Sequence, residues 1–180
     1  HSLVLSIDKF IQHDVDRELA AAVKNARAKA GTAIVMESDT GRILALSNYP
    51  PFNCNTYNEY KPERWRNRVV ADMFEPGSTF KVVVATAALE AGLTRPDDVI
   101  DCENGSFSLA GHVFRDHRQY GKLTFNEVLE QSVNIGAIKL GLRLGRQGLH
   151  DAMKHFGFGS RTGIDLPGEI AGFVRDTEEW

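Results

Sequence analysis

The chain has 180 residues, of which 42% are hydrophobic, so it is long enough and apolar enough to bury a real core. Its net charge of −3 removes the electrostatic case for a nucleic-acid-binding protein, which normally carries a basic stripe, and we expect no nucleic acid as a partner. The longest strongly apolar run, residues 82 to 89, is far shorter than the roughly 20 residues that a membrane span needs. Repeats and low-complexity linkers are absent, so residues 1 to 180 are predicted to form one continuous unit.

The first quarter of the chain predicts a strand, a helix and a β-hairpin. Residues 3 to 7 alternate enough for a short strand, and Asp8 is placed to cap a helix that we expect to run to about Ala30. Apolar side chains recur at every fourth position of that helix. Two strand-like runs, 32 to 36 and 42 to 47, flank the turn-forming sequence ESDTG and therefore predict a hairpin.

The middle of the chain predicts irregular segments and short elements. Residues 48 to 65 hold three prolines and four asparagines, which favour a long surface loop. The polar, glycine-bearing segment 94 to 122 predicts short strands and turns. Thr124 and Glu127 then have the spacing of a capping box, which predicts a short helix over residues 125 to 131.

The last third predicts two helices that follow a break at the sequence QSVNIG. The first helix is expected from about Ile135 to Leu144, and Gly145 is expected to end it. Residues 147 to 156 predict one more short helix before the glycine-rich sequence FGFGSRTGIDLPGE.

The most informative pair of residues is Ser78 and Lys81, at the start of the apolar helical run. Residues three apart lie on one face of a helix, so the lysine amine can reach the serine hydroxyl. A serine becomes a good nucleophile when a base takes its proton, and burial together with the helix dipole lowers the pKa of a lysine amine. The pair therefore indicates a serine nucleophile with a lysine general base.

The polar patterns of this chain also have non-catalytic interpretations. The pattern Ser-x-x-Lys is expected about once by chance in a chain of ordinary composition. A second copy, Ser6 to Lys9, spans a strand end and a helix cap with no buried face to perturb the lysine, and we interpret it as structural. Arg115 to Arg118 form a mixed-charge cluster that is more typical of a solvated loop than of a catalytic site.

The residues around Ser78 carry a family resemblance. The sequence FEPGSTFK resembles the active-site block of the class B penicillin-binding proteins, which are peptidoglycan transpeptidases, and the division-associated branch is the most similar. Four further blocks occur in the family's order across nearly the whole chain: LVLSIDKFIQ, AIVMESDTGRILALSNYPPFN, LTFNEVLEQSVNIGAIKLGLRLG and FGFGSRTGIDLPGE.

The resemblance implies a role for each of four residues. Ser78 is the expected acylated nucleophile and Lys81 its general base. The family's second motif, Ser-x-Asn, is matched by Ser132 and Asn134: the serine relays protons to the leaving amine and the asparagine binds the peptide. The implied activity is a peptidoglycan D,D-transpeptidase that forms an acyl-serine with stem peptides ending in D-alanyl-D-alanine and is acylated by β-lactams. The resemblance implies no cofactor, and the histidines and cysteines lack metal-ligand spacing.

The implied fold is α+β, an α/β/α sandwich of the penicillin-binding transpeptidase and serine β-lactamase type with a five-stranded antiparallel sheet. The third family motif, Lys-Thr-Gly, has no match at its place, and Arg161 to Gly163 lie in a different family block and predict a turn. We therefore expect the N-terminal portion of a transpeptidase domain, present only in part. Its uncovered apolar surface favours self-association or a rearranged packing. Acylation is expected to be weak, because the third motif supplies one of the family's two oxyanion donors. The parent is expected outside the cytoplasm, at the periplasmic face of the inner membrane, anchored by an N-terminal transmembrane helix absent here.

The sequence leaves three other points open. A serine β-lactamase or β-lactam sensor is an alternative from the same fold family, and a non-catalytic scaffold of a wall-synthesis complex is an alternative from another class. Other cell-wall synthesis or division proteins are expected partners of the parent. Cys54 and Cys102 are consistent with a disulfide or with two separate thiols, and the unpaired interpretation is slightly favoured.

Overall fold

The computed structural model describes residues 3–180, which form two compact units. The first unit runs to Asp72 and includes Ile164–Ile170, and the second comprises Met73–Gly163 and Ala171–Trp180. Every helix and strand of the described residues lies within one unit or the other, so no regular element joins them.

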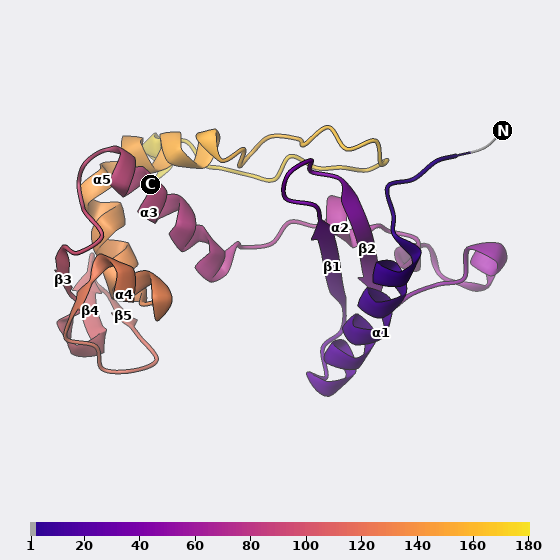
Figure 1. The fold of residues 1–180 in the computed structure, drawn as a ribbon, viewed down its shortest axis with the longest axis horizontal. Helices are drawn as coiled ribbons and strands as arrows, with labels where there is room; N and C mark the ends of the chain where they lie inside the picture. The colour runs from indigo at the N-terminus through magenta and orange to yellow at the C-terminus, as the bar shows by residue number, and fades with distance from the viewer. Residues whose placement is uncertain (1–2) are drawn as a thin grey trace. The chain divides into compact units, whose positions relative to one another are not determined.

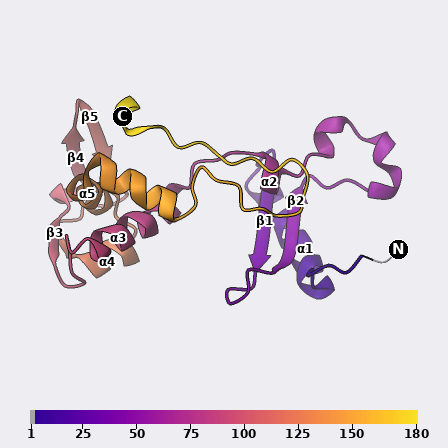
Figure 2. The same cartoon turned by 90° about the horizontal axis from the view of Figure 1, so that it is seen from above.

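The first unit is a helix packed on a β-hairpin, as Figures 1 and 2 show. Asp8 caps α1 (Lys9–Asn25) by accepting hydrogen bonds from the backbone N–H groups of Phe10 at 2.8 Å and Ile11 at 3.0 Å. Strands β1 (Gly31–Met36) and β2 (Ile43–Tyr49) are antiparallel. The predicted cap and the predicted hairpin are both confirmed.

Two predictions for this unit are wrong. Residues 3 to 7 form no strand, because no backbone ladder joins them to β2: the Ser6 hydroxyl donates to the Ile43 carbonyl, and the backbone bond to Leu44 comes from the next residue, Asp8. Helix α1 ends at Asn25 and not near Ala30, because Arg27 adopts a left-handed φ of 52° that interrupts the helical backbone.

The segment after β2 is the predicted surface loop, folded on itself by short helical turns. It contains two 3₁₀ helices, η1 (Cys54–Glu59) and η2 (Pro62–Arg64), and is followed by α2 (Arg68–Ala71). The Trp65 indole N–H donates to the Tyr57 carbonyl at 2.9 Å, and the two rings meet edge to face. Its cysteine, Cys54, is an exposed free thiol.

The second unit combines helices with two small antiparallel strand pairs, and the protein therefore has the predicted α+β class. Strand β3 (Val99–Asp101) pairs with β6 (Lys122–Thr124), and β4 (Ser106–Leu109) pairs with β5 (His112–Arg115), which confirms short strands between residues 94 and 122. The elements in chain order are η3 (Gly77–Thr79), α3 (Phe80–Glu90), β3 (Val99–Asp101), η4 (Glu103–Gly105), β4 (Ser106–Leu109), β5 (His112–Arg115), β6 (Lys122–Thr124), α4 (Phe125–Glu130), α5 (Asn134–His155) and η5 (Thr177–Glu179).

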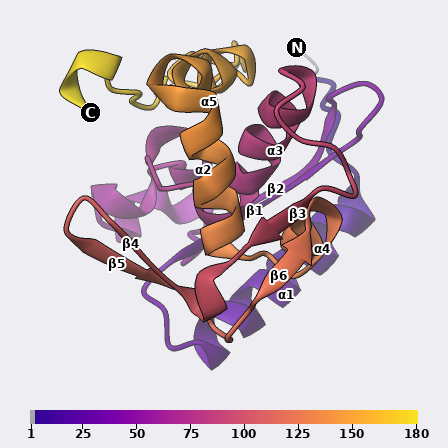
Figure 3. The ribbon, with the colours of Figure 1, turned by 90° about the vertical axis from the view of Figure 1, so that its left-hand side faces the viewer.

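The capping box and the glycine break are both present as predicted. The Thr124 hydroxyl accepts from the Glu127 N–H at 3.3 Å, and the Glu127 carboxylate accepts from the Thr124 N–H at 2.7 Å. The carboxylate accepts from both the backbone N–H and the hydroxyl of Thr124, and these two bonds lower the pKa of Glu127. Gly145 has a φ of 69°, which glycine adopts without strain, and Figure 3 shows α5 changing direction along its length.

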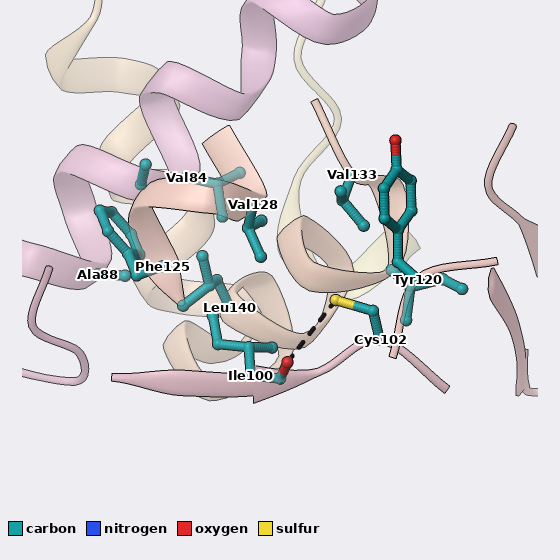
Figure 4. Close-up of a cluster of buried hydrophobic side chains, with 11 residues drawn as sticks. Val84, Ala88, Ile100, Cys102, Tyr120, Phe125, Val128, Val133 and Leu140 are labelled. Carbon is teal, nitrogen blue, oxygen red and sulfur yellow. Dashed lines mark hydrogen bonds between the residues drawn. The ribbon is translucent and has the colours of Figure 1, made fainter. Parts of the chain in front are cut away.

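The core of this unit lies where α3, α4 and α5 meet β3, as Figure 4 shows. The largest fully buried side chains are Phe125, Ile100, Ile135, Leu140, Val128, Val133 and Cys102. Cys102 is a free thiol, and its sulfur contacts the Ile100 carbonyl at 3.8 Å. The two cysteines are thus separate thiols, one exposed and one buried, as the unpaired interpretation held. The core fixes the helices that carry the candidate site.

The contact between α4 and α5 makes Gly136 sensitive to substitution. A Cβ at this position would lie 2.5 and 2.7 Å from the two methyl groups of Val128, a fully buried side chain. We expect Gly136→Ala to lower the free energy of unfolding by about 1–3 kcal/mol, measured by denaturant unfolding. At the control position, Gly148, the nearest atom is 3.6 Å away, so Gly148→Ala should stabilise the helix by up to about 1 kcal/mol. Equal effects of the two substitutions would contradict this packing.

Candidate active site

Ser78 lies at the mouth of α3, on a turn that exposes its hydroxyl. It occupies the middle of η3, and this 3₁₀ turn runs directly into α3. Gly77 before it has a φ of 60°, a backbone conformation that a residue with a Cβ rarely adopts. The sequence predicts Ser78 in the first helical turn, and the structure places it in this tighter turn at the same point.

Lys81 follows one turn later and points back to Ser78. Its amine donates to the Ser78 hydroxyl oxygen at 3.3 Å, as the spacing of three residues predicts. The side chain is half-buried. This burial lowers the pKa of the Lys81 amine, and the carboxylate of Asp116 partly opposes the shift by raising it. The structure therefore favours the neutral amine more than water does.

Ser132 meets the same amine from the turn between α4 and α5. The Lys81 amine donates to the Ser132 hydroxyl oxygen at 3.0 Å and also to the Ser132 backbone carbonyl. Ser132 has a φ of 53°, a left-handed backbone conformation that costs energy for a residue with a Cβ. The structure thus brings Ser78, Lys81 and Ser132 together around one nitrogen atom.

Asn134 is the first residue of α5 and lies beside this cluster. Its side-chain amide donates to the Arg115 carbonyl at 3.3 Å, and its backbone N–H donates to the Asp116 carboxylate at 2.5 Å. The residue is exposed and lines the same pocket as Lys81. It is therefore close to the three convergent groups and accessible to a ligand.

The pocket that Lys81 and Asn134 line has a volume of about 610 Å³ and is mostly apolar. Its walls come from α3, α5, the end of β5 and Trp180. Few polar groups line it, and Lys81 and Asn134 are among them. Such a concave apolar site with a few convergent polar groups is typical of ligand binding.

Asp116 is a residue that sequence reasoning missed. The interpretation of residues 115 to 118 as a solvated loop holds for His117 and Arg118, which are exposed, whereas Arg115 is exposed but is the last residue of β5. Asp116 is half-buried, and its two carboxylate oxygens accept from the first two N–H groups of α5. One signal was available: Val133 precedes α5 and has no polar side chain with which to cap it.

The second Ser-x-x-Lys copy and the Arg-Thr-Gly sequence show no comparable arrangement. The Ser6 hydroxyl donates to the Ile43 carbonyl, and Lys9 is an exposed residue at the start of α1. Arg161 to Gly163 lie in an irregular segment with no assigned turn, in which Gly163 has a φ of 81°.

Within residues 3–180, no group of three or more histidine, cysteine, aspartate or glutamate side chains is arranged to hold a metal ion. No helix in the same stretch combines the length and the apolar character needed to cross a bilayer.

Comparison with known proteins identifies relatives along the whole chain. The chain is 37% identical over 180 residues to the peptidoglycan D,D-transpeptidase FtsI of Escherichia coli K12, covering 100% of this chain and 30% of that protein. It is 36% identical to the probable peptidoglycan D,D-transpeptidase PenA of Neisseria gonorrhoeae, covering 99% of this chain and again 30% of the relative. The chain thus spans about a third of the length of these curated relatives.

A solved structure and a family match agree with these relatives. The transpeptidase domain of Burkholderia pseudomallei penicillin-binding protein 3 is similar with a TM-score of 0.84 and 35% identity, covering 98% of this chain and 49% of that one. The fold class and the family resemblance that the sequence predicts are confirmed, with the fold present in part. Residues 31–180 match the penicillin binding protein transpeptidase domain, and the chain therefore belongs to that family.

Proposed function

We propose that this chain carries the nucleophile, the base and the proton relay of a peptidoglycan D,D-transpeptidase. The observation that supports the proposal most is the position of the Lys81 amine, within hydrogen-bond distance of the hydroxyls of both Ser78 and Ser132. One amine between two hydroxyls suits a reaction in which one serine loses a proton and a leaving group gains one. The names of the relatives support the same activity.

The first half-reaction forms an acyl-serine. The neutral Lys81 amine takes the proton of the Ser78 hydroxyl, and the oxygen attacks the carbonyl carbon between the two terminal D-alanines of a stem peptide. The backbone N–H of Ser78, at the start of the helix, is positioned to donate to the developing oxyanion. The C–N bond then breaks, and the proton passes from Lys81 through Ser132 to the nitrogen of the departing D-alanine.

The second half-reaction restores the serine. The amine of a neighbouring stem peptide attacks the acyl carbon and loses a proton to Lys81. The bond from the acyl carbon to the Ser78 oxygen breaks, and that oxygen takes the proton back from Lys81. The new amide is the cross-link. Asn134, exposed in the same pocket, hydrogen-bonds the bound peptide. A β-lactam acylates Ser78 in the same way, because opening its ring replaces the release of D-alanine. No step uses a cofactor.

The cellular setting follows from the substrate. Peptidoglycan is assembled outside the cytoplasmic membrane, so we place the protein on that side, in a wall-synthesis complex that serves division. The similarity to FtsI and PenA supports this setting. Its partners there are stem peptides and other proteins of wall synthesis.

The test is turnover of a synthetic stem peptide by the full-length protein that contains this chain. We expect release of free D-alanine, together with a cross-linked product when an acceptor amine is present. Fast catalytic hydrolysis of penicillin without release of D-alanine would contradict the proposal and support a β-lactamase. Absence of both reactions would support a non-catalytic scaffold.

A further inference from the structure

The start of α5 lacks a cap of its own. Val133 occupies the position before the helix, and its apolar side chain accepts no hydrogen bond from the first-turn N–H groups. Asp116, distant in sequence, supplies the missing acceptors. One carboxylate oxygen accepts from the Asn134 N–H at 2.5 Å and the other from the Ile135 N–H at 3.2 Å. A carboxylate at this end of a helix is also favoured by the helix dipole.

The segment that carries Asp116 is itself held in place. The Asp116 N–H donates to the Gly105 carbonyl at 3.1 Å, which ties the end of β5 to the start of β4. The neighbouring Arg115 carbonyl accepts from the side-chain amide of Asn134 at 3.3 Å. Two consecutive residues therefore bind Asn134: Asp116 accepts from its backbone N–H, and the Arg115 carbonyl accepts from its side-chain amide.

The turn just before Asn134 is the strained one at Ser132. On its upstream side, the N–H groups of Ser132 and Val133 donate to carbonyls of α4, at 3.0 and 2.9 Å. On its downstream side, the Ser132 carbonyl accepts from the Lys81 amine, and the next bonds to a different segment are those that Asp116 accepts. A left-handed serine persists when its surroundings determine its backbone from both directions.

We propose that Asp116 is a positioning residue for the acylation reaction. By holding the first turn of α5, it keeps the Ser132 hydroxyl where Lys81 reaches it and keeps Asn134 in the pocket. This inference rests on the proposed function, and Asp116 acts through Ser132 and Asn134 without touching the reacting atoms.

The position of Asp116 has an electrostatic consequence as well. Its carboxylate raises the pKa of Lys81 and so works against the burial that lowers it. The Asp116 carboxylate thus keeps the Lys81 amine protonated to a somewhat higher pH, which disfavours the neutral base. The same carboxylate orders the Ser132 turn, and this ordering offsets the disadvantage. A neutral residue at position 116 should separate the effect of Asp116 on the pKa of Lys81 from its effect on the order of the Ser132 turn.

The kinetic test measures acylation by a chromogenic β-lactam in the full-length protein, with the acylation rate constant separated from the binding constant. We expect Asp116→Ala to lower the rate constant by about tenfold or more while binding changes much less, because misplaced catalytic groups lose rate before affinity. Asp116→Asn keeps one acceptor oxygen and should fall between wild type and alanine. Asp101→Ala is the matched control, because Asp101 caps a single N–H, of Glu103, elsewhere in the unit.

The pH dependence of the acylation rate distinguishes the proposed role of Asp116 from a loss of stability, because a loss of stability alone would not shift it. Removing the charge at position 116 lowers the pKa of Lys81, so the neutral base persists to lower pH. The acid limb of the acylation profile should therefore shift to lower pH in Asp116→Asn and stay in place in Asp101→Ala. An unshifted limb with an unchanged rate constant in both Asp116 variants would overturn the proposal.

Amide hydrogen exchange makes the inference testable apart from the proposed chemistry. In Asp116→Ala, the amides of Asn134 and Ile135 should lose protection, while those of α3 keep it. If wild-type protein is not acylated at all, the proposed function fails, and this exchange experiment still decides whether Asp116 holds the turn. Full protection of both amides in Asp116→Ala would overturn the inference.

Discussion

Ser78→Ala should abolish covalent labelling of the full-length protein by a fluorescent penicillin. The expected loss in acylation rate is on the order of a thousandfold or more, because the substitution removes the oxygen that forms the acyl bond. Ser78 is exposed at the start of α3 and its hydroxyl has Lys81 as its partner, so the fold should tolerate the change. Labelling is read by gel fluorescence after denaturation.

The second Ser-x-x-Lys copy supplies a matched control for that substitution. Ser6→Ala removes a hydroxyl from the same local pattern, but this hydroxyl donates to the Ile43 carbonyl and lies outside the site. Labelling of this variant should equal that of wild type. Persistent labelling of Ser78→Ala would show that a different residue takes the acyl group.

Lys81→Arg should lower the acylation rate by about a hundredfold or more, although the positive charge is kept. A guanidinium stays protonated near neutral pH and cannot accept the serine proton, whereas burial lowers the pKa of the Lys81 amine. The rate of penicillin acylation is the measurement. Lys9→Arg, in the second copy, is the control and should acylate like wild type.

One result would contradict the role of Lys81 as the general base. Near-normal acylation by Lys81→Arg would mean that the residue serves only as a positive charge. Because the pKa of Lys81 is lowered, the wild-type rate should rise with pH through a limb that lies below the usual range for lysine. A wild-type limb that coincides with ordinary lysine titration would argue against the effect of burial.

The elements that the sequence predicts well are those fixed by neighbouring residues. Asp8 caps α1, and Thr124 and Glu127 form a capping box, through contacts within a few residues. Gly145 ends the first part of α5 through its own positive φ. Residues 3 to 7 have the alternation of a strand but find too few backbone partners to form one. The end of α1 depends on the left-handed Arg27, for which the sequence carries no strong signal.

The same distinction between local and distant contacts applies to the candidate site. Ser78 and Lys81 are three residues apart, so the geometry of a helix start brings them together. The approach of Ser132 to Lys81 spans 51 residues, and the sequence indicates it through the family resemblance alone. Asp116 was missed because its role depends on its approach to α5, 18 residues away, and a lone aspartate in a charged segment does not predict that approach.

The central claim is that Ser78 forms the acyl-enzyme, and peptide mapping tests it most directly. The full-length protein is incubated with penicillin, denatured, digested and fragmented in a mass spectrometer. Opening of the lactam ring loses no atoms, so the account predicts one added penicillin mass per chain, located on Ser78 and absent from Ser78→Ala. The same mass found on another residue, Ser132 included, or no added mass on the folded protein, would contradict the account.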